Sequence, residues 1–291
     1  MNSTELSTFL TVAEQRSISA AARLLHVSQP AVSKRIRQLE TRLDCRLFDR
    51  VGKQMTMTQA GQTLKPQAER LMSLWSDTTR ELHNLSAAVT GTLQLATSHH
   101  IGLHRLAPVL AEFRANYPNV QMNISFEDSE VTHTLVREGR IDVAVATLDP
   151  EALDPALQTR CVWDDPLAFV HPEIAQTTLA QLSTLPCVLP GMATYTGRIV
   201  ANCFSTAQLA LQPAMQTNYL ETIQMLVGVG MGWSVLPVTM CADLNVVQVE
   251  DATGQTVRLA RELGVITHPQ RVLSNAANAF LSTLDRYADP V

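Results

Sequence analysis

The stretch 17–50, SISAAARLLHVSQPAVSKRIRQLETRLDCRLFDR, constrains the fold more than any other part of this chain. Ser17 is suited to cap one short helix and Ser28 a second, with Pro30 in the first turn of the second, where a missing amide costs little. The second helix carries apolar residues spaced as on one helical face, namely Val32, Ile36, Leu39 and Leu43. We therefore predict two helices joined by a tight turn, the second with one buried stripe.

A polar face lies on another side of the second predicted helix. Gln29, Ser33 and Arg37 are spaced by four residues, and Lys34 and Arg35 flank them. Amide, hydroxyl and guanidinium groups on the free face of a packed helix are what reading the major groove of DNA requires. The stretch therefore predicts a DNA-binding helix-turn-helix. The residues expected to read or approach bases are Gln29, Pro30, Ser33, Lys34 and Arg37.

A wing is expected after the second helix. Residues 46–50 lead into a turn at 51–54 between two short extended segments. This arrangement places Arg50 and Lys53 where, together with Arg35, they can hold phosphates. Phosphate contacts supply salt-dependent affinity rather than sequence choice.

The charge of the chain is unevenly distributed. Residues 1–60 carry nine Lys and Arg against five Asp and Glu, a net charge of +4, whereas the whole chain carries −5, so the remainder carries −9. A solvated charged face is the ordinary explanation of such a cluster, but it does not explain why the positive charge coincides with the helix-turn-helix. The asymmetry favours a protein that touches DNA with one end.

A long amphipathic helix is predicted next. Thr58 can cap a helix that runs to about residue 86, and Pro66 near its start can bend it locally. Its seam alternates in steps of four and three: Leu64, Ala68, Leu71, Trp75, Thr78, Leu82 and Leu85. A helix of roughly 40 Å outside a compact domain needs a partner. We interpret it as a dimerisation helix, and packing against the C-terminal part of the same chain is the alternative.

Strands and helices alternate beyond Thr90-Gly91, which predicts an α/β domain with a largely parallel sheet. We expect strands over 93–97, 120–126 and 141–147 and helices over 100–117 and 131–139. Leu148-Asp149-Pro150 is a plausible hinge into a second lobe. Residues 258–267 would return to the first lobe, and 274–287 would form a final helix.

These N-terminal motifs closely resemble the LysR-type transcriptional regulators. The resemblance is dense over about the first 65 residues and looser beyond them. It is carried by Ala20–Leu25 (AAARLL), Ser28–Ser33 (SQPAVS), Leu39-Glu40, Leu43, Leu47-Phe48, Arg50, Thr56 and Thr58–Gly61 (TQAG).

The resemblance implies an N-terminal, mainly α winged helix-turn-helix, a long linker helix, and a two-lobed α/β effector domain similar to a type 2 periplasmic binding protein. We expect these parts over 1–58, 59–89 and 90–291. Within the effector domain, lobe 1 would take about 90–147 and 267–291, and lobe 2 about 148–266.

Candidate effector residues lie where strands end and helices begin, because free amides there attract anions. Hydroxyls follow two such points, at Thr97-Ser98-His99 and at Thr194-Tyr195-Thr196. By resemblance to the family, similar positions face each other across a cleft and bind small, often anionic metabolites, and Ser129, Thr147 and Asn218 join them. The alternative is that these residues are helix caps alone. The expected effector residues are Thr97, Ser98, His99, Ser129, Thr147, Thr194, Thr196 and Asn218.

A histidine cluster leaves three interpretations open. His100 and His104 share a helix face next to His99, a spacing that could hold a divalent metal, but no acidic residue or cysteine is adjacent in sequence. A pH-tunable anion contact and ordinary packing are the alternatives. We therefore expect no metal site and no cofactor.

The five cysteines are scattered and form no CxxC pair, which favours a reduced compartment. Cys187 and Cys203 are the candidates for a redox pair, and buried thiols are the alternative. One uncharged run, 222–242, is long enough to suggest a membrane span. Its three glycines and Pro237 favour a buried helix, a glycine turn and a buried strand instead. No signal peptide is expected.

The sequence thus favours a cytoplasmic, non-enzymatic DNA-binding regulator. Its expected partners are promoter DNA, further copies of the chain as homodimer or homotetramer, a small co-inducer and RNA polymerase, with no membrane. Two other classes are an architectural protein that binds DNA without sequence preference and a solute-binding protein without regulatory DNA binding. No nucleophile–base pair or phosphate loop supports an enzyme.

Overall fold

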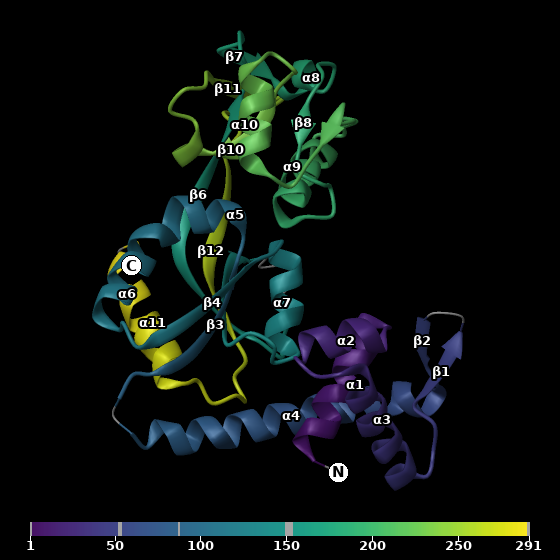
Figure 1. Cartoon of the computed structure of the whole chain (residues 1–291). Helices are drawn as coiled ribbons and strands as arrows, with labels where there is room; N and C mark the ends of the chain where they lie inside the picture. The colour runs from purple at the N-terminus through teal and green to yellow at the C-terminus, as the bar shows by residue number, and fades with distance from the viewer. Residues whose placement is uncertain (1, 52–53, 87, 149–153, 290–291) are drawn as a thin grey trace. The chain divides into compact units, whose positions relative to one another are not determined.

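Two compact units make up the chain, Met1–Ser86 and Ala87–Val291 (Figure 1). The structure is a computed structural model that describes residues 2–51, 54–86, 88–148 and 154–289.

The first unit is a winged helix-turn-helix followed by a long helix, as the sequence predicts. Its elements are α1 (Ser3–Gln15), α2 (Ile18–Leu24), α3 (Gln29–Leu43), β1 (Phe48–Val51), β2 (Gln54–Met57) and α4 (Gln59–Asn84). Ser17 and Ser28 cap α2 and α3, and each side chain accepts a hydrogen bond from the amide three residues later. The two helices are therefore placed by the short polar residues that the sequence puts before them.

The core of this unit forms where α1, α2 and α3 meet. Phe9, Val32 and Leu39 are fully buried in it, together with Leu47 at the entry to the wing. Leu43, predicted to continue the stripe of α3, is instead 37% exposed. The prediction fails there because α3 ends at this residue and the chain turns away through Asp44 in a left-handed conformation.

The wing is an antiparallel hairpin of β1 and β2. The Glu40 carboxylate of α3 accepts hydrogen bonds from the amides of Leu47 and Phe48, at 2.8 and 3.3 Å, and so fixes where the hairpin begins. The base of α4 then returns to the same place, since a side chain on Gly61 would come within 2.3 Å of the Leu47 carbonyl oxygen. Gly61 is therefore required by this close approach.

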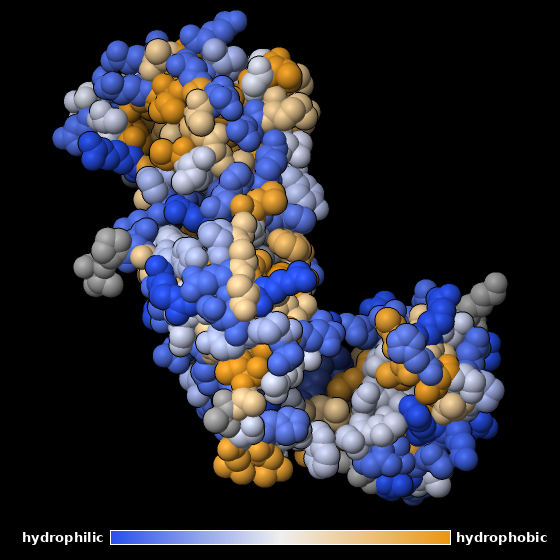
Figure 2. Space-filling model, turned by 60° about the vertical axis from the view of Figure 1, so that its left-hand side comes forward, coloured by the Kyte–Doolittle hydropathy of each residue, from blue (hydrophilic) through white to orange (hydrophobic). Residues whose placement is uncertain are grey.

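The helix α4 leaves its own unit as it runs. It has 26 residues, a length of about 39 Å. Leu64 and Ala68 pack against the core of the unit. Further along, large apolar side chains are exposed: Leu71, Leu74, Trp75, Leu82 and Leu85. Figure 2 shows how orange apolar side chains interrupt the polar surface of the molecule.

The second unit is an α/β domain with two lobes joined by long strands (Figure 1). The main sheet has the order β4-β3-β5-β12-β6-β11-β7, with β10 also paired to β6, and β8 pairs with β9. Its strands are β3 (Gly91–Thr97), β4 (Val120–Phe126), β5 (Val143–Leu148), β6 (Gln158–Val170), β7 (Gln176–Thr178), β8 (Val188–Leu189), β9 (Met215–Gln216), β10 (Ser234–Pro237), β11 (Val246–Glu250) and β12 (Leu259–Thr267). Its helices are α5 (His99–Ile101), α6 (Ala107–Asn116), α7 (Ser129–Arg137), α8 (Leu179–Leu182), α9 (Tyr195–Thr206), α10 (Leu220–Gly228) and α11 (Asn275–Leu284), with the π-helical turn η1 (Gly102–Leu106) and the 3₁₀ turns η2 (Val238–Met240) and η3 (Asp285–Tyr287).

The sheet is mixed rather than largely parallel, which corrects the sequence prediction. The strands β4, β3 and β5 are parallel, as are β11 and β7, but β12 is antiparallel to both β5 and β6. The long strands β6 and β12 each run from one lobe into the other. They carry the two chain crossings, and antiparallel pairing follows because one leads out and the other returns.

Each lobe has its own apolar core. In the first lobe, Phe113 of α6 packs edge-on against Phe280 of α11, and both are fully buried. In the second lobe, Trp233 stacks on Phe204, and its indole N–H donates to the Leu182 carbonyl at 2.9 Å. The two lobes are therefore separately packed bodies on a shared sheet.

The uncharged run 222–242 forms a helix, a glycine turn and the buried strand β10, in the predicted order, but the helix is buried on one face only, since Met225 is 54% exposed. Gly232 has φ +136°, and a side chain there would meet the Pro186 carbonyl oxygen at 2.2 Å. No helix in the described part of the chain is long and apolar enough to cross a membrane.

The helix predicted over 100–117 is interrupted. It is built from α5, the π-helical turn η1 and α6 in succession. π-Helical turns are rare inside α-helices and are frequent at functional sites. This interruption sets the positions of His100 and His104.

Candidate functional site

The recognition helix α3 presents the predicted polar face. Gln29, Pro30, Lys34 and Arg37 are exposed, and Ser33 is half-buried between them. A shallow depression on this helix is lined by Lys34, Arg37, Gln38, Thr41 and Arg42. Cationic and amide groups thus gather on the free side of the helix, opposite the stripe that packs on α1 and α2.

Three of the predicted DNA contacts make hydrogen bonds within the unit, and the first of them, Arg37, donates from Nε to the Ser33 carbonyl at 3.2 Å. Arg35 is half-buried, and its guanidinium donates to the Thr8 hydroxyl at 3.4 Å. The side-chain amide of Gln29 donates to the Ser19 hydroxyl of α2 at 3.1 Å. Arg50 is exposed on β1, whereas Lys53 lies outside the described residues. Of the predicted phosphate contacts, Arg50 is therefore presented at the surface and Arg35 is held against α1.

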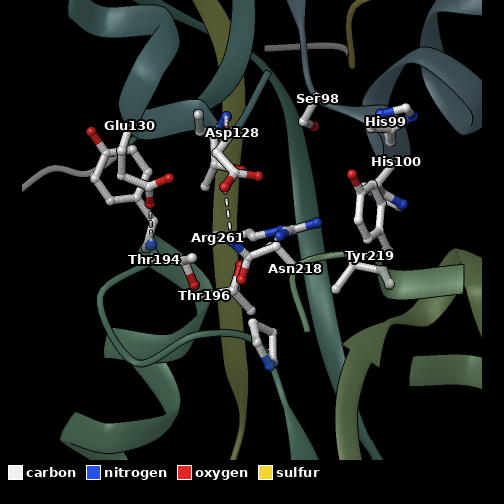
Figure 3. Close-up of a pocket in the computed structure, with 15 residues that line it drawn as sticks. Ser98, His99, His100, Asp128, Glu130, Thr194, Thr196, Asn218, Tyr219 and Arg261 are labelled. Atoms are coloured by element: carbon white, nitrogen blue, oxygen red, sulfur yellow. Dashed lines mark hydrogen bonds between the residues drawn. The ribbon is translucent and has the colours of Figure 1, made fainter. Parts of the chain in front are cut away.

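A cavity of about 70 Å³ lies between the two lobes of the second unit (Figure 3). It has room for roughly five waters. Seven of the eight effector residues expected from the sequence line it: Ser98, His99, Ser129, Thr147, Thr194, Thr196 and Asn218. The eighth, Thr97, is buried outside the lining, and its hydroxyl lacks a hydrogen-bond partner in the described residues.

Lobe 2 contributes the start of α9 and the two residues before α10, Asn218 and Tyr219. Thr194 caps α9, accepting from the Gly197 amide at 3.1 Å and donating to the Gly191 carbonyl at 2.7 Å. Asn218 accepts from the Gly191 amide at 3.0 Å. The first turn of α9 therefore presents backbone amides to the cavity, with the positive end of the helix dipole behind them.

Lobe 1 contributes the ends of β3, β4 and β5. The Ser98 hydroxyl caps α5, accepting from the Ile101 amide at 3.5 Å. The Ser129 hydroxyl accepts from the Thr147 amide at 3.1 Å. His99 is held between two rings, stacked on Phe126 and edge-on to Tyr219. Hydroxyls at the ends of these strands thus face the amides of lobe 2.

Two carboxylates of lobe 1 bridge the cavity to lobe 2. Glu130 accepts a hydrogen bond from the Tyr195 amide at 2.6 Å, and Asp128 accepts from the Asn218 side chain at 2.8 Å (Figure 3). Both donors belong to the positions that the sequence predicts for an anionic ligand. The lobes are therefore held together in this structure by acidic groups of the chain itself.

A buried ion pair forms the floor of the cavity. Arg261 of β12 lies directly across from Asp165 of β6, and its Nε donates to the Asp165 carboxylate at 2.8 Å. Arg105 approaches the other oxygen of Asp165 at 3.3 Å. A second nitrogen of Arg261, Nη1, donates to the hydroxyl of Thr196, a residue that lines the cavity, at 2.6 Å.

The Arg261 guanidinium also has one hydrogen-bond donor that the described part of the chain does not use. Its Nη2 is buried and is without a hydrogen-bond partner among the residues described. Burial lowers the pKa of Arg261, and the charge of Asp165 opposes that change. A buried cation with an unused donor is a strong attractor for an anion or a carbonyl oxygen.

His100 also lines the cavity and is buried. Its pKa is lowered to about 3 by burial first, and then by the charges of Arg261, His104 and Arg105. The Asp165 carboxylate is 3.8 Å from Nε2 and would raise the pKa, but two arginines already neutralise that carboxylate. The imidazole is therefore uncharged at neutral pH.

Several cavity residues were not predicted from the sequence. Arg261, Asp128, Glu130 and Tyr219 line it, and Asp165 supports it from beneath. A signal was present for two of them, since Asp165 and Arg261 are charged residues within extended segments, each next to another charge, Asp164 or Glu262. Such charges are rarely buried without a partner.

The cysteines show no activated thiol. Burial raises the pKa of Cys187 to about 11 and also raises that of Cys203. Both thiols stay protonated at neutral pH, and protonated thiols are poor nucleophiles. An unreactive thiol, buried at Cys187 and half-buried at Cys203, thus describes these residues better than a redox pair.

Comparison with known proteins assigns both units to one family. Residues 3–62 match the family model described as "Bacterial regulatory helix-turn-helix protein, lysR family", and residues 86–289 match "LysR substrate binding domain". A "Probable RuBisCO transcriptional regulator" of Thalassiosira pseudonana is 28% identical over 96% of this chain and 95% of its own. An "Uncharacterized HTH-type transcriptional regulator in ibpB-leuC intergenic region" of Azotobacter vinelandii is 53% identical over 38% of this chain and 77% of its own.

The fold agrees with that assignment. The structure of full-length CbnR complexed with its target DNA has a TM-score of 0.65 and 20% identity, covering 99% of this chain and all of that one. The family comprises transcription regulators rather than enzymes. The chain therefore belongs to the LysR family of DNA-binding transcriptional regulators and carries an effector-binding domain.

Proposed function

We propose that this regulator binds a small anionic metabolite in the cavity between its lobes and, as a homo-oligomer, changes its hold on promoter DNA in response. The observation that carries the ligand assignment is Arg261, which lines the cavity and whose buried Nη2 has no hydrogen-bond partner among the described residues. The amides at the start of α9 and the hydroxyls of Ser98 and Thr196 supply further donors. These groups together suit a carboxylate or a phosphate.

The bridging carboxylates suggest how such a ligand would act. Glu130 and Asp128 now occupy the Tyr195 amide and the Asn218 side chain. An incoming anion would compete for those donors, release the two carboxylates and change the angle between the lobes. A ligand shifts such an equilibrium only by its difference in affinity between the two arrangements.

The DNA contacts are proposed from the exposed face of α3. Ser33, Lys34 and Arg37 would read or approach bases in the major groove, with Gln29 and Pro30 at the start of the helix. Arg50 would hold a phosphate, and Arg35 would contribute to the local field from its place beside Thr8. Full-length CbnR, whose fold this chain shares, is described in a complex with its target DNA.

Oligomerisation is proposed to run through α4. Leu74 and Trp75 are each 64% exposed on this helix, and an apolar stripe of that kind is usually covered by a partner. Two copies joined in this way would present two recognition helices to two half-sites. RNA polymerase is the further partner expected at a promoter, and the cytoplasm is the compartment where all of them meet.

A serine pair tests the ligand site. Ser98→Ala removes a hydroxyl that lines the cavity, and Ser274→Ala removes an equivalent N-cap from α11, outside the cavity lining. Both should cost about 1 kcal/mol of stability as lost caps. Small carboxylates and phosphates, with their neutral amides as controls, are titrated by calorimetry. We expect Ser98→Ala alone to weaken anion binding, and equal effects of the two variants would reject the site.

The DNA assignment is tested with a second serine pair. Ser33→Ala on α3 should reduce discrimination between a specific site and random DNA, whereas the half-buried Ser73→Ala on α4 should not. The specific site comes from sheared genomic DNA retained by the protein and sequenced. Equal losses on specific and random DNA for Ser33→Ala would remove Ser33 from base reading. A bound anion that leaves footprint and bend angle unchanged would reject the response mechanism.

A further inference from the structure

Two histidines and one glutamate meet at the edge of the cavity. His100 lies on α5, His104 on the π-helical turn η1, and Glu221 in the first turn of α10. Each offers one donor atom, and the three atoms all lie within 4.8 Å of one another. The third group is far away in the sequence, which is why the two histidines seemed to lack an acidic companion.

The two imidazoles are brought together by the π-helical turn. Their ring centroids are 5.1 Å apart, and the planes are inclined by 37°. Glu221 reaches them from the other lobe, with Oε1 3.5 Å from His104 Nε2. Helix α10 follows the residues Asn218 and Tyr219 that line the cavity, so the cluster joins lobe 1 to lobe 2.

A simple ion pair between His104 and Glu221 does not account for the third member. His100 is 95% buried, and neither of its ring nitrogens has a hydrogen-bond partner within the described chain. Glu221 Oε1 is likewise without a hydrogen bond there. Buried polar atoms without partners are costly, and an unplaced ion is one of the explanations for them.

The donor set is one that a divalent transition metal accepts. Zinc binds imidazole nitrogen and carboxylate oxygen at about 2.0–2.2 Å in a tetrahedron, which places donor atoms about 3.4 Å apart. The present spacing needs a contraction of up to about 1.4 Å, and the side chains of His104 and Glu221 are both 34% exposed and can move to make it. Asp165, 3.8 Å from His100 Nε2, stands where an outer carboxylate orients a metal-binding histidine.

We propose that His100, His104 and Glu221 form a binding site for a divalent transition metal, with Zn²⁺ the best match, and that the ion ties the two lobes together. Three protein donors leave a fourth position open for water or another ligand. Because the histidines and the glutamate come from different lobes, the ion would favour the arrangement of the lobes that this structure shows. Metal binding is measured without any metabolite, so its outcome is independent of the proposed anionic ligand.

The test uses the full-length protein after treatment with a chelator. Co²⁺ is titrated while visible absorption is recorded, since tetrahedral Co²⁺ absorbs more strongly than octahedral Co²⁺, and Zn²⁺ is then added in competition. His104→Ala and Glu221→Gln are compared with His83→Ala, which removes an exposed histidine of α4. Circular dichroism and metal-free thermal unfolding check folding, and both substituted side chains are exposed enough for the variants to fold.

We expect one tetrahedral ion per chain, an affinity reduced at least tenfold in His104→Ala and in Glu221→Gln, and no change in His83→Ala. Zn²⁺ should raise the unfolding temperature of the wild type and not of the two site variants. Absence of stoichiometric binding, an octahedral spectrum, or an affinity unchanged by both substitutions would overturn the proposal.

Discussion

Asp165→Asn is the most informative single change in the effector domain. The side chain is fully buried and receives Arg261 at 2.8 Å and Arg105 at 3.3 Å. The substitution keeps the shape and removes the negative charge, so Arg261, itself 8% exposed, becomes a buried cation without its counter-ion. Breaking a buried pair in this way costs about 3–5 kcal/mol.

The lower end of that range is expected. The side chain of Arg105 is 19% exposed and can turn toward water, and the new amide oxygen can still accept one hydrogen bond. We therefore predict a loss of about 3 kcal/mol, which corresponds to a fall of about 6–12 °C in the unfolding temperature of a domain of this size.

Urea unfolding followed by tryptophan fluorescence measures this loss. The chain has three tryptophans, and a Trp75→Phe background leaves Trp163 and Trp233, which both lie in the second unit. Asp285→Asn is the control, because it breaks an ion pair with Arg160 in which both side chains are about half exposed. That change should cost less than about 1 kcal/mol.

A double variant separates charge from packing. Asp165→Leu with Arg261→Met replaces the pair by apolar groups and should recover much of the stability lost in Asp165→Asn. A cost below about 1 kcal/mol for Asp165→Asn, or a double variant less stable than the single one, would refute the view that an uncompensated buried charge sets the effect.

Three further predictions concern other parts of the chain. The pKa of His100 is about 3 in the folded state and 6.5 in the unfolded state, so the unfolded state binds the extra proton, and acidification from pH 7 to 5.5 should lower the free energy of unfolding by about 1 kcal/mol. Urea unfolding at several pH values measures this slope: a His100→Gln variant that lacks it would support the prediction, and an unchanged slope would contradict it. Trp75→Glu should reduce the mass seen by light scattering by disrupting the oligomer, whereas Gln62→Glu, on the opposite face of α4, should not. Gly232→Ala should lower the free energy of unfolding by more than Gly230→Ala, because Gly230 also has a positive φ, +86°, but has open space around it. Equal losses in urea unfolding would show that the backbone conformation, rather than the contact with Pro186, dominates.

The winged helix-turn-helix could be predicted because its information is local. Ser17 and Ser28 stand three residues before the amides that they cap, and the stripe of α3 repeats with the period of one helix. Leu43 was mispredicted for a related reason, since periodicity reports the face of a residue and not where the core ends.

The effector domain depends on contacts that no local pattern contains. The strand-end pattern identified four lining residues, Ser98, His99, Thr194 and Thr196, because strand ends in an α/β sheet meet at one edge. The family resemblance supplied the other three, Ser129, Thr147 and Asn218. The partners that complete the site arrive from far along the chain, as Arg261 does for Asp165 and Glu221 for His104. The antiparallel direction of β12 was missed because strand spacing does not reveal which neighbour a returning strand will take.

The sheet narrows where it passes from one lobe to the other, and the position of this narrow section determines how the lobes can move. Among the described residues, β5 pairs with β12 only from Glu262 onward, and β10 pairs with β6 only from Leu167 onward. In this part of the described chain the sheet is two strands wide, at Ala260 opposite Pro166 and Arg261 opposite Asp165. A ribbon this narrow twists more readily than it shears, since its ladder hydrogen bonds resist sliding. The lobes should thus rotate about the long axis of the ribbon like the two ends of a torsion bar. The ion pair between Arg261 and Asp165 lies at the narrowest section of this ribbon, so a ligand that rotates the lobes must act against it.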